Sequence, residues 1–380
     1  MLKQRVQFFL TDPVVPGEVA VDGIKFDFCD GVRILFPNGG GEHRVMLTDN
    51  DTGECIQDTV VCDGGKFRSE IRYFVNWRIE IGRNVNGEWF NIFTHDFNAK
   101  GREVLFIMNT DAIGDTIAWF PYVSMFAGKH GCKTGVVVGE QMRPLLEPMY
   151  PHIKFFPRGT EKILAPYASF RLGINYECNE NFQKMNYWKM PLAQLIGYDL
   201  GLENEIGFDS PQPPFIADAG VWRSDFPYVC MAVNGSMKAK GWNNGEAIDE
   251  TVEYLKSRGY RVMLIDKEKT DLHGAEDLTG LHPLTERASL IKGAKMFIGM
   301  SSGLSWLAWA CRVPVILLSG FTEPWHEFRT HYRVLNWHAC HGCWNKPDKS
   351  FPCREDGICE CSTAINSKMV IDQIKRIIGE

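Results

Sequence analysis

The 380-residue sequence lacks any run of about 18 apolar residues, the length that a membrane-spanning helix requires. Its first apolar run, residues 6–10, is too short for the core of a secretion signal. It also lacks a long basic run, and its net charge is -6, which argues against a nucleic-acid-binding protein. No internal repeat is visible. We therefore expect a cytoplasmic protein with no membrane span and no nucleic-acid partner.

The chain is long for a single core, so two or three domains are expected. Residues 1–98 have a β pattern, because runs such as 24–28 and 77–81 alternate apolar with polar residues. Clusters of Gly, Asn and Asp, such as 37–41 and 84–87, separate these runs and favour antiparallel hairpins. We expect a small N-terminal β-rich domain.

From residue 104 the pattern becomes α/β, because strand-like runs alternate with helical stretches. The predicted strands are 104–108, 134–138, 228–233, 261–265, 296–299 and 313–318. The predicted helices are 116–129, 141–149, 246–258, 286–292, 303–311 and 369–378. A proline-rich stretch at 210–214 is typical of a linker, so we predict Rossmann-like halves at 99–214 and 215–380. Ligands of such halves bind in a cleft at the carboxyl ends of the strands.

Two strand-to-helix junctions favour anion binding, because the free N–H groups and the dipole of a helix start attract negative charge. The first junction contains Gly114, Asp115 and Thr116. Since Asp115 would repel phosphate, a carboxylate there suits chemistry; the alternative is a simple first-turn or capping residue. Asp111 competes with it for the same role. The second junction is the turn Ser301, Ser302, Gly303 and Leu304, which could also be an ordinary helix cap.

The loop after the predicted strand 228–233 holds two candidates for binding a diphosphate. Lys240 could neutralise its charge, and Ser236 could donate a hydrogen bond. Lys238 competes with Lys240, and either lysine could equally be a solvated loop residue.

Twelve cysteines are many for a cytosolic enzyme, and five of them lie within residues 340–361. Such a cluster in a reducing compartment favours a metal site over disulfides. Cys340 and Cys343 form a Cys-x-x-Cys pair, and two more thiolates would complete a tetrahedral site. Cys353, Cys359 and Cys361 compete for the two remaining places. His338 and His341 are possible substitutes.

The stretch 49–51 has the Asp-x-Asp form that metal-dependent sugar transferases use. It falls among the predicted strands of the N-terminal part, outside both α/β halves. We interpret it as a hairpin turn. Lysine and helix dipoles would then have to balance the charge of a diphosphate.

Several segments together resemble the bacterial autotransporter heptosyltransferases, within the wider heptosyltransferase family of lipopolysaccharide synthesis. They are GDTIAWFPY (114–122), KGW (240–242), SSGLSWLAWA (301–310), SGF (319–321) and CHGCWN (340–345). The resemblance covers residues 95–370. The lipopolysaccharide enzymes typically have Asp and His where this chain has Ser301 and Trp306, and they lack the cysteines.

The resemblance implies a GT-B glycosyltransferase that moves heptose from ADP-heptose to serine hydroxyls of an autotransporter adhesin, with inversion. The family's catalytic aspartate maps to Asp115 and its phosphate-binding lysine to Lys240. The family also carries one iron held by four cysteines and assembles into ring-shaped dodecamers. We assign Cys340, Cys343, Cys353 and Cys361 as its ligands, with zinc as the alternative metal. The chain departs from the family in having Cys359 as an additional candidate.

Two other functions fit the sequence less well. A lipopolysaccharide-core heptosyltransferase would be favoured by a basic or amphipathic membrane-facing surface, which the sequence does not indicate. A non-catalytic scaffold that binds a sugar nucleotide or a metal would be favoured if function survived the loss of Asp115.

Overall fold

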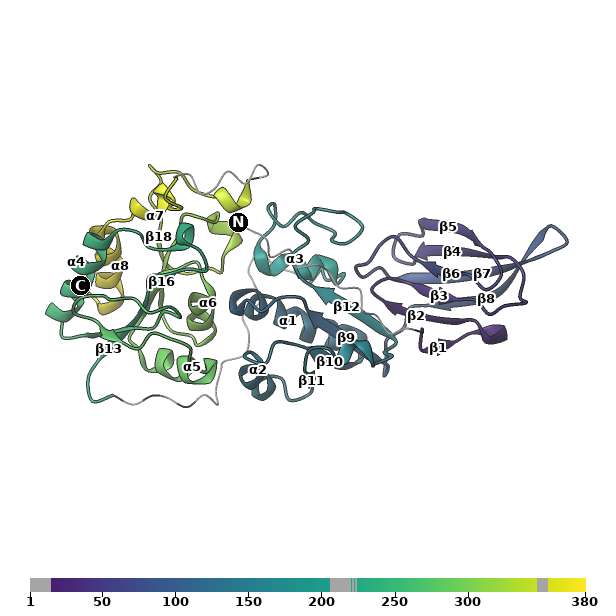
Figure 1. Cartoon of the computed structure of the whole chain (residues 1–380), viewed down its shortest axis with the longest axis horizontal. Helices are drawn as coiled ribbons and strands as arrows, with labels where there is room; N and C mark the ends of the chain where they lie inside the picture. The colour runs from purple at the N-terminus through teal and green to yellow at the C-terminus, as the bar shows by residue number, and fades with distance from the viewer. Residues whose placement is uncertain (1–14, 206–219, 221, 223, 347–354) are drawn as a thin grey trace.

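The computed structural model describes residues 15–205, 220, 222, 224–346 and 355–380. The expectations for residues 6–10, the linker at 210–214 and Cys353 lie outside the described residues. Three parts follow one another along the molecule: a β-rich part, a first α/β half and a second α/β half (Figure 1). Among the described residues, no helix has the length and apolar character needed to cross a bilayer.

The first half is a parallel sheet in the order β11-β10-β9-β12, flanked by helices. Its strands are β9 (Glu103–Met108), β10 (Lys133–Val137), β11 (Lys154–Phe156) and β12 (Ala168–Leu172), and its helices are α1 (Ile113–His130), α2 (Arg143–Met149) and α3 (Leu192–Asp199). The strands predicted at 104–108 and 134–138 and the helices predicted at 116–129 and 141–149 are confirmed. Strands β11 and β12 and helix α3 were not predicted.

The β-rich part contains one sheet of its own and also extends the sheet of the first half. The separate sheet is antiparallel, β5-β4-β7-β8, formed by β4 (His43–Asp49), β5 (Cys55–Val61), β7 (Trp77–Val85) and β8 (Glu88–Asp96). The stretch 49–51 lies at the turn between β4 and β5, as predicted. The other strands are β1 (Glu18–Val19), β2 (Lys25–Cys29), β3 (Arg33–Leu35) and β6 (Lys66–Arg68). Since β2 pairs in parallel with β12, one eight-stranded sheet crosses the predicted boundary at residue 98.

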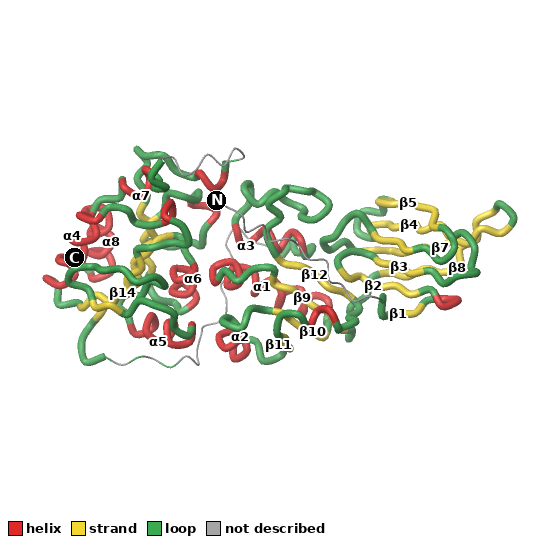
Figure 2. Tube along the Cα trace, in the orientation of Figure 1, coloured by secondary structure: helices red, strands yellow, loops and turns green. Residues whose placement is uncertain are grey.

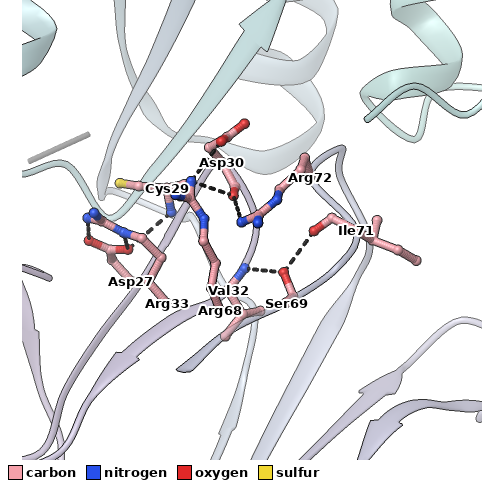
Figure 3. A network of polar contacts seen from close by, with 9 residues as sticks. All are labelled: Asp27, Cys29, Asp30, Val32, Arg33, Arg68, Ser69, Ile71 and Arg72. Carbon is pink, nitrogen blue, oxygen red and sulfur yellow. Dashed lines mark hydrogen bonds and ion pairs between the residues drawn. The ribbon is translucent and has the colours of Figure 1, made fainter. Parts of the chain in front are cut away.

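Ion pairs between arginines and aspartates surround the end of β2, the strand that pairs with β12 of the first half (Figure 3). Arg33 contacts both carboxylate oxygens of Asp27, whose side chain is fully buried. Arg68 Nη2 lies 2.7 Å from Asp30 Oδ2, and Arg72 Nη1 donates to the backbone oxygen of Asp30. A buried carboxylate is tolerated when it is paired in this way. The network fixes the loop that leads from β2 to β3.

The second half is a six-stranded parallel sheet in the order β15-β14-β13-β16-β17-β18. Its strands are β13 (Tyr228–Ala232), β14 (Arg261–Leu264), β15 (Glu276–Asp277), β16 (Phe297–Met300), β17 (Val315–Leu318) and β18 (Tyr332–Val334). Its helices are α4 (Gly245–Ser257), α5 (Leu284–Gly293), α6 (Gly303–Ala310), α7 (Glu360–Thr363) and α8 (Ser367–Ile378). Side chains of α4 and α8 share one apolar cluster, and side chains of α5 and α6 belong to another, so helices cover both faces (Figure 2). The predicted strands and helices of this half, and its parallel pairing, are confirmed.

The two α/β halves meet through helices. Helix α1 packs against α6, and α2 touches α5. His326, in the short 3-10 helix Pro324–His326, donates from Nδ1 to the backbone oxygen of Met190, 3.1 Å away in the first half. Burial lowers the pKa of His326 to about 4, so the ring is neutral at this contact. The halves therefore share an interface of apolar and polar contacts.

Candidate active site

The starts of α1 and α6, which are the two predicted anion-binding junctions, face each other across the two halves. A Cβ added to Gly114 would lie 2.8 Å from Trp306 Cδ1, and one added to Gly303 would lie 2.9 Å from Ile113 Cβ. Only glycine allows backbones to approach this closely. The sequence thus brings together two helix starts that are almost 190 residues apart.

Replacing Gly114 with alanine is expected to force the two halves apart, because Trp306 is buried and its ring cannot move away. Overpacking of this kind costs about 1–3 kcal/mol. Gly128, in the same helix, has nothing within 4 Å, so Gly128→Ala should instead add about 0.5–1 kcal/mol of stability. Urea denaturation and transfer assays of both variants would test this. Equal behaviour of the two variants would contradict the contact.

Asp115 lies in the first turn of α1 and is only partly exposed. The hydroxyl of Thr110 donates to its Oδ2 atom at 3.2 Å. Burial raises the pKa of Asp115 to about 6, against the opposing influence of Lys240 and of the Thr110 hydrogen bond. A carboxyl group with a pKa near the working pH is suited to accept a proton. The competing residue, Asp111, has a side chain that is 74% exposed and paired with Arg158 at 2.6 Å.

Lys240 reaches the same place from the second half. It ends the short 3-10 helix Lys238–Lys240, and its Nζ atom lies 5.2 Å from the ring centroids of both Phe321 and Trp344. Burial lowers the pKa of Lys240, while Asp115 and Glu327 raise it. Asp115 and Lys240, which the sequence analysis took from two separate junctions, therefore interact electrostatically. Lys238 is exposed.

The other predicted substrate-binding residues differ in their surroundings. Ser302 is the residue before α6 and makes no capping hydrogen bond with its side chain. The hydroxyl oxygens of Ser301 and Thr322 lie 3.4 Å apart, and Ser236 is exposed in the loop before Lys240. Thr116 is buried and donates to the Ala112 carbonyl oxygen, so its hydroxyl is engaged inside the helix. Leu304 follows Gly303 in the first turn of α6.

The sequence analysis did not select Glu327, a buried carboxylate in the loop after β17. Glu327 accepts hydrogen bonds from Ser319 Oγ at 2.7 Å and from Thr322, and it is paired with Arg333. Its only sequence signal was proximity to the segment 319–321. Because a buried charge needs partners, this network fixes the loop after β17.

Four of the five clustered cysteines gather around the backbone at Gly320 and Phe321. Cys359 and Cys361 are buried in one cluster with Phe321, and Cys340 packs against that cluster. Gly342, at φ +69, forms the turn before the buried Cys343 and donates its N–H to the Gly320 oxygen. His341 contacts Ala339 and Glu323 instead.

Within the part of the chain that the structure describes, no three His, Cys, Asp or Glu side chains form a group placed to hold a metal ion. The predicted ligand Cys353 is outside that part. The donor chemistry fits iron or zinc, since thiolates converge on one turn. The choice among Cys353, Cys359 and Cys361 stays a prediction.

Two family models match the chain. One is described as the N-terminal domain of glycosyltransferase TibC and matches residues 21–85; the other is glycosyltransferase family 9 (heptosyltransferase) and matches residues 188–358. The autotransporter heptosyltransferase TibC of Escherichia coli O78:H11 is 38% identical over 359 residues, which cover 90% of this chain and 84% of TibC. The chain belongs to the autotransporter heptosyltransferases. It is a glycosyltransferase by family, as the sequence analysis predicted.

The structural comparison agrees with this family assignment. The crystal structure of TibC, an iron-containing dodecamer, matches with a TM-score of 0.88 and 34% identity, over 97% of this chain and 99% of that chain. TibC has also been crystallised with ADP-D-β-D-heptose. A second autotransporter heptosyltransferase, BAHTCr of Citrobacter rodentium, is 35% identical over 99% of this chain and 94% of its own length. BimC of Burkholderia thailandensis is 32% identical, over 96% of this chain and 87% of its own length. It is named an inactive autotransporter heptosyltransferase. Activity therefore has to be argued from the site as well as from the family.

Proposed function

We propose that this chain transfers heptose from ADP-heptose to serine hydroxyls of an autotransporter adhesin, in the cytoplasm and with inversion at the anomeric carbon. The observation that carries the proposal is that Asp115 and Lys240, from opposite halves, lie close enough to shift each other's pKa. A basic carboxylate beside a cation is what this reaction needs, since a proton leaves one substrate and negative charge develops on the other. The complex of TibC with an ADP-heptose supports the choice of donor.

In the proposed step, Asp115 accepts the proton of the acceptor hydroxyl while that oxygen forms a bond to the anomeric carbon. The bond from this carbon to the diphosphate oxygen breaks at the same time, and its electron pair leaves with ADP. Attack from the side opposite the leaving group inverts the configuration. Thr110 orients the carboxylate through its hydrogen bond to Oδ2.

The charge that develops on the leaving diphosphate is stabilised from the second half. Lys240 supplies a positive charge there. Burial lowers the pKa of its ammonium group, and Asp115 and Glu327 oppose that effect. The N–H groups at the start of α6, at Ser302, Gly303 and Leu304, point along a helix dipole that favours anions. Ser236 and Ser301 add hydroxyl donors. Gly114 keeps the two helix starts close together.

We also propose that the cysteine segment holds one iron ion through Cys340, Cys343, Cys353 and Cys361, and that the chain forms a homo-oligomer. The gathering of cysteines at Gly320 and the iron-containing, dodecameric TibC support both points. Four thiolates leave no open coordination position, so the ion would stabilise the fold and take no part in the reaction. Zinc is the alternative metal.

The proposed transfer can be tested by the intact mass of a candidate adhesin passenger co-expressed with this chain. We expect mass increments of one heptose residue, lost when the acceptor serines are replaced by alanine. Modification of lipopolysaccharide without modification of the passenger would favour the core-heptosyltransferase alternative. Binding of ADP-heptose without transfer to either acceptor would favour a non-catalytic scaffold, the state that the inactive relative suggests.

Lys240→Met is expected to weaken ADP-heptose binding by roughly 1.5–3 kcal/mol, the contribution of a hydrogen bond to a charged group. Methionine keeps the unbranched chain between the two rings and removes only the charge. Calorimetric titration with ADP-heptose would measure the change, with Lys238→Met as the matched control from the same short helix. A larger effect at the control residue would show that the wrong lysine was chosen.

A further inference from the structure

Trp344 follows the predicted metal ligand Cys343 directly, yet its ring lies at the active site. The indole is 5.2 Å from Lys240 Nζ and shares this contact with Phe321, whose ring centroid is 5.9 Å from that of Trp344. The sequence analysis gave neither aromatic ring a role in the site. Together they hold the side chain of the lysine that faces Asp115.

The backbone of Trp344 is fixed by the cysteine turn. The 3-10 helix Cys343–Asn345 follows Gly342, and the Trp344 N–H donates to the Phe321 oxygen at 3.0 Å. Asn345 Oδ1 accepts the N–H of Glu323 at 2.9 Å. The backbone of Trp344 therefore cannot shift without moving the segment that carries the cysteines.

The opposite edge of Trp344 contacts the first half. Its ring centroid is 5.7 Å from that of the buried Tyr187 and 6.0 Å from that of Tyr176. Burial raises the pKa of Tyr176, and the nearby Asp115 carboxylate adds to this effect. Asn345 Nδ2 donates to the Trp188 oxygen at 3.4 Å. The Trp344 side chain thus connects Lys240, on the donor side, with the loop of the first half that lies near the proposed base, Asp115.

We propose that Trp344 is a positioning residue for the transfer reaction, which holds Lys240 toward the donor diphosphate and links the cysteine segment to the active site. This inference rests on the proposed function. Aromatic faces attract an ammonium group through their quadrupole, without accepting its hydrogen bonds. The three N–H donors of Lys240 thereby stay available for phosphate oxygens, whereas a hydrogen-bonded carboxylate would occupy some of these donors. Restricting the four-carbon stem also lowers the entropy lost when the donor binds.

The test compares Trp344→Phe with Trp344→Leu, because phenylalanine keeps an aromatic face and leucine keeps only apolar bulk. Trp344→Leu removes one cation–π contact and leaves the Lys240 side chain less ordered. We expect this variant to bind ADP roughly 3- to 30-fold more weakly than the wild type. Trp344→Phe should lie within about three-fold of wild type. Metal content, measured on the same samples, should stay unchanged in both. Trp337→Leu is the matched control, since this tryptophan lies in the same segment and is 66% exposed.

A double-mutant cycle separates positioning from a general structural role. If Trp344 acts through Lys240, then Trp344→Leu should have almost no further effect on ADP binding in a Lys240→Met background. Additive losses, equal losses in the phenylalanine and leucine variants, or metal loss in Trp344→Leu would each overturn the inference. Lys240→Met with unchanged ADP affinity would instead contradict the proposed role of the lysine. Absence of transfer by the wild type would contradict the proposed function.

Discussion

Replacing Asp115 with asparagine is expected to slow heptose transfer by roughly 100- to 10,000-fold, the contribution of a positioned general base. Asparagine keeps the size of the side chain and can still contact Thr110, but it cannot accept a proton from the serine hydroxyl. Binding of ADP-heptose should stay within a few-fold, because the proposed contacts to the diphosphate come from Lys240 and the α6 start. Single-turnover transfer and calorimetry would measure the two effects separately.

The matched control is Asp111→Asn, four residues earlier. Asp111 is exposed and ion-paired with Arg158, away from the coupling between Asp115 and Lys240. This variant should transfer heptose at close to the wild-type rate. If Asp111→Asn were the inactive variant and Asp115→Asn the active one, the assignment of the base would be reversed.

The pH dependence of transfer follows from the same carboxylate. Asp115 has to be deprotonated to act as a base, and burial raises its pKa to about 6. In the wild type, kcat/KM for the donor should therefore be constant above this pH and fall as pH is lowered through about 6. A bound diphosphate adds negative charge and engages Lys240, which stabilises the protonated carboxyl. The pKa seen in kcat should then lie above the pKa seen in kcat/KM, and an opposite order would contradict the coupling.

Local patterns were enough to predict the two α/β halves, and with the family resemblance they selected the two main candidate residues. Helical and strand periods differ, so the alternation after residue 104 predicted most of the elements between β9 and α8, but not β11, β12, α3, β15, β18 and α7. Asp115 and Lys240 each follow the first strand of a half, and active sites form at the carboxyl ends of such strands. Their positions in the sequence were therefore informative before any contact was known.

The contacts between distant segments could not be predicted in the same way. Parallel pairing of β2 with β12 depends on residues about 140 positions apart, and no local pattern records it. The cation–π contacts of Lys240 with Phe321 and Trp344 likewise join three loops of the second half. Glu327 looked like an ordinary charged residue, because only the folded chain shows that Ser319, Thr322 and Arg333 surround it.

Removing the metal is expected to destabilise the second half and to weaken donor binding through Trp344. In its described residues, the cysteine segment forms one small buried cluster with Phe321, and Trp344 adds contacts with the first half, so bound metal would supply much of its stability. A metal present at about 1,000 times its Kd adds about 4 kcal/mol to the native state. Chelation of the wild type, followed by thermal unfolding and ADP titration, should therefore lower both the unfolding midpoint and the affinity for ADP.

Single Cys→Ser changes at the five clustered positions would identify the ligands, with elemental analysis of each purified variant. We expect metal loss at Cys340, Cys343, Cys353 and Cys361 and retention at Cys359. Cys132→Ser is the matched control, since Cys132 lies far along the chain and contacts only the Thr134 hydroxyl by a side-chain hydrogen bond. Metal loss at Cys359 with retention at Cys353 would exchange the third ligand. A wild type with no stoichiometric metal would remove the site, and the stability of the Trp344 turn would then depend on its contacts with Gly320 and Phe321 alone.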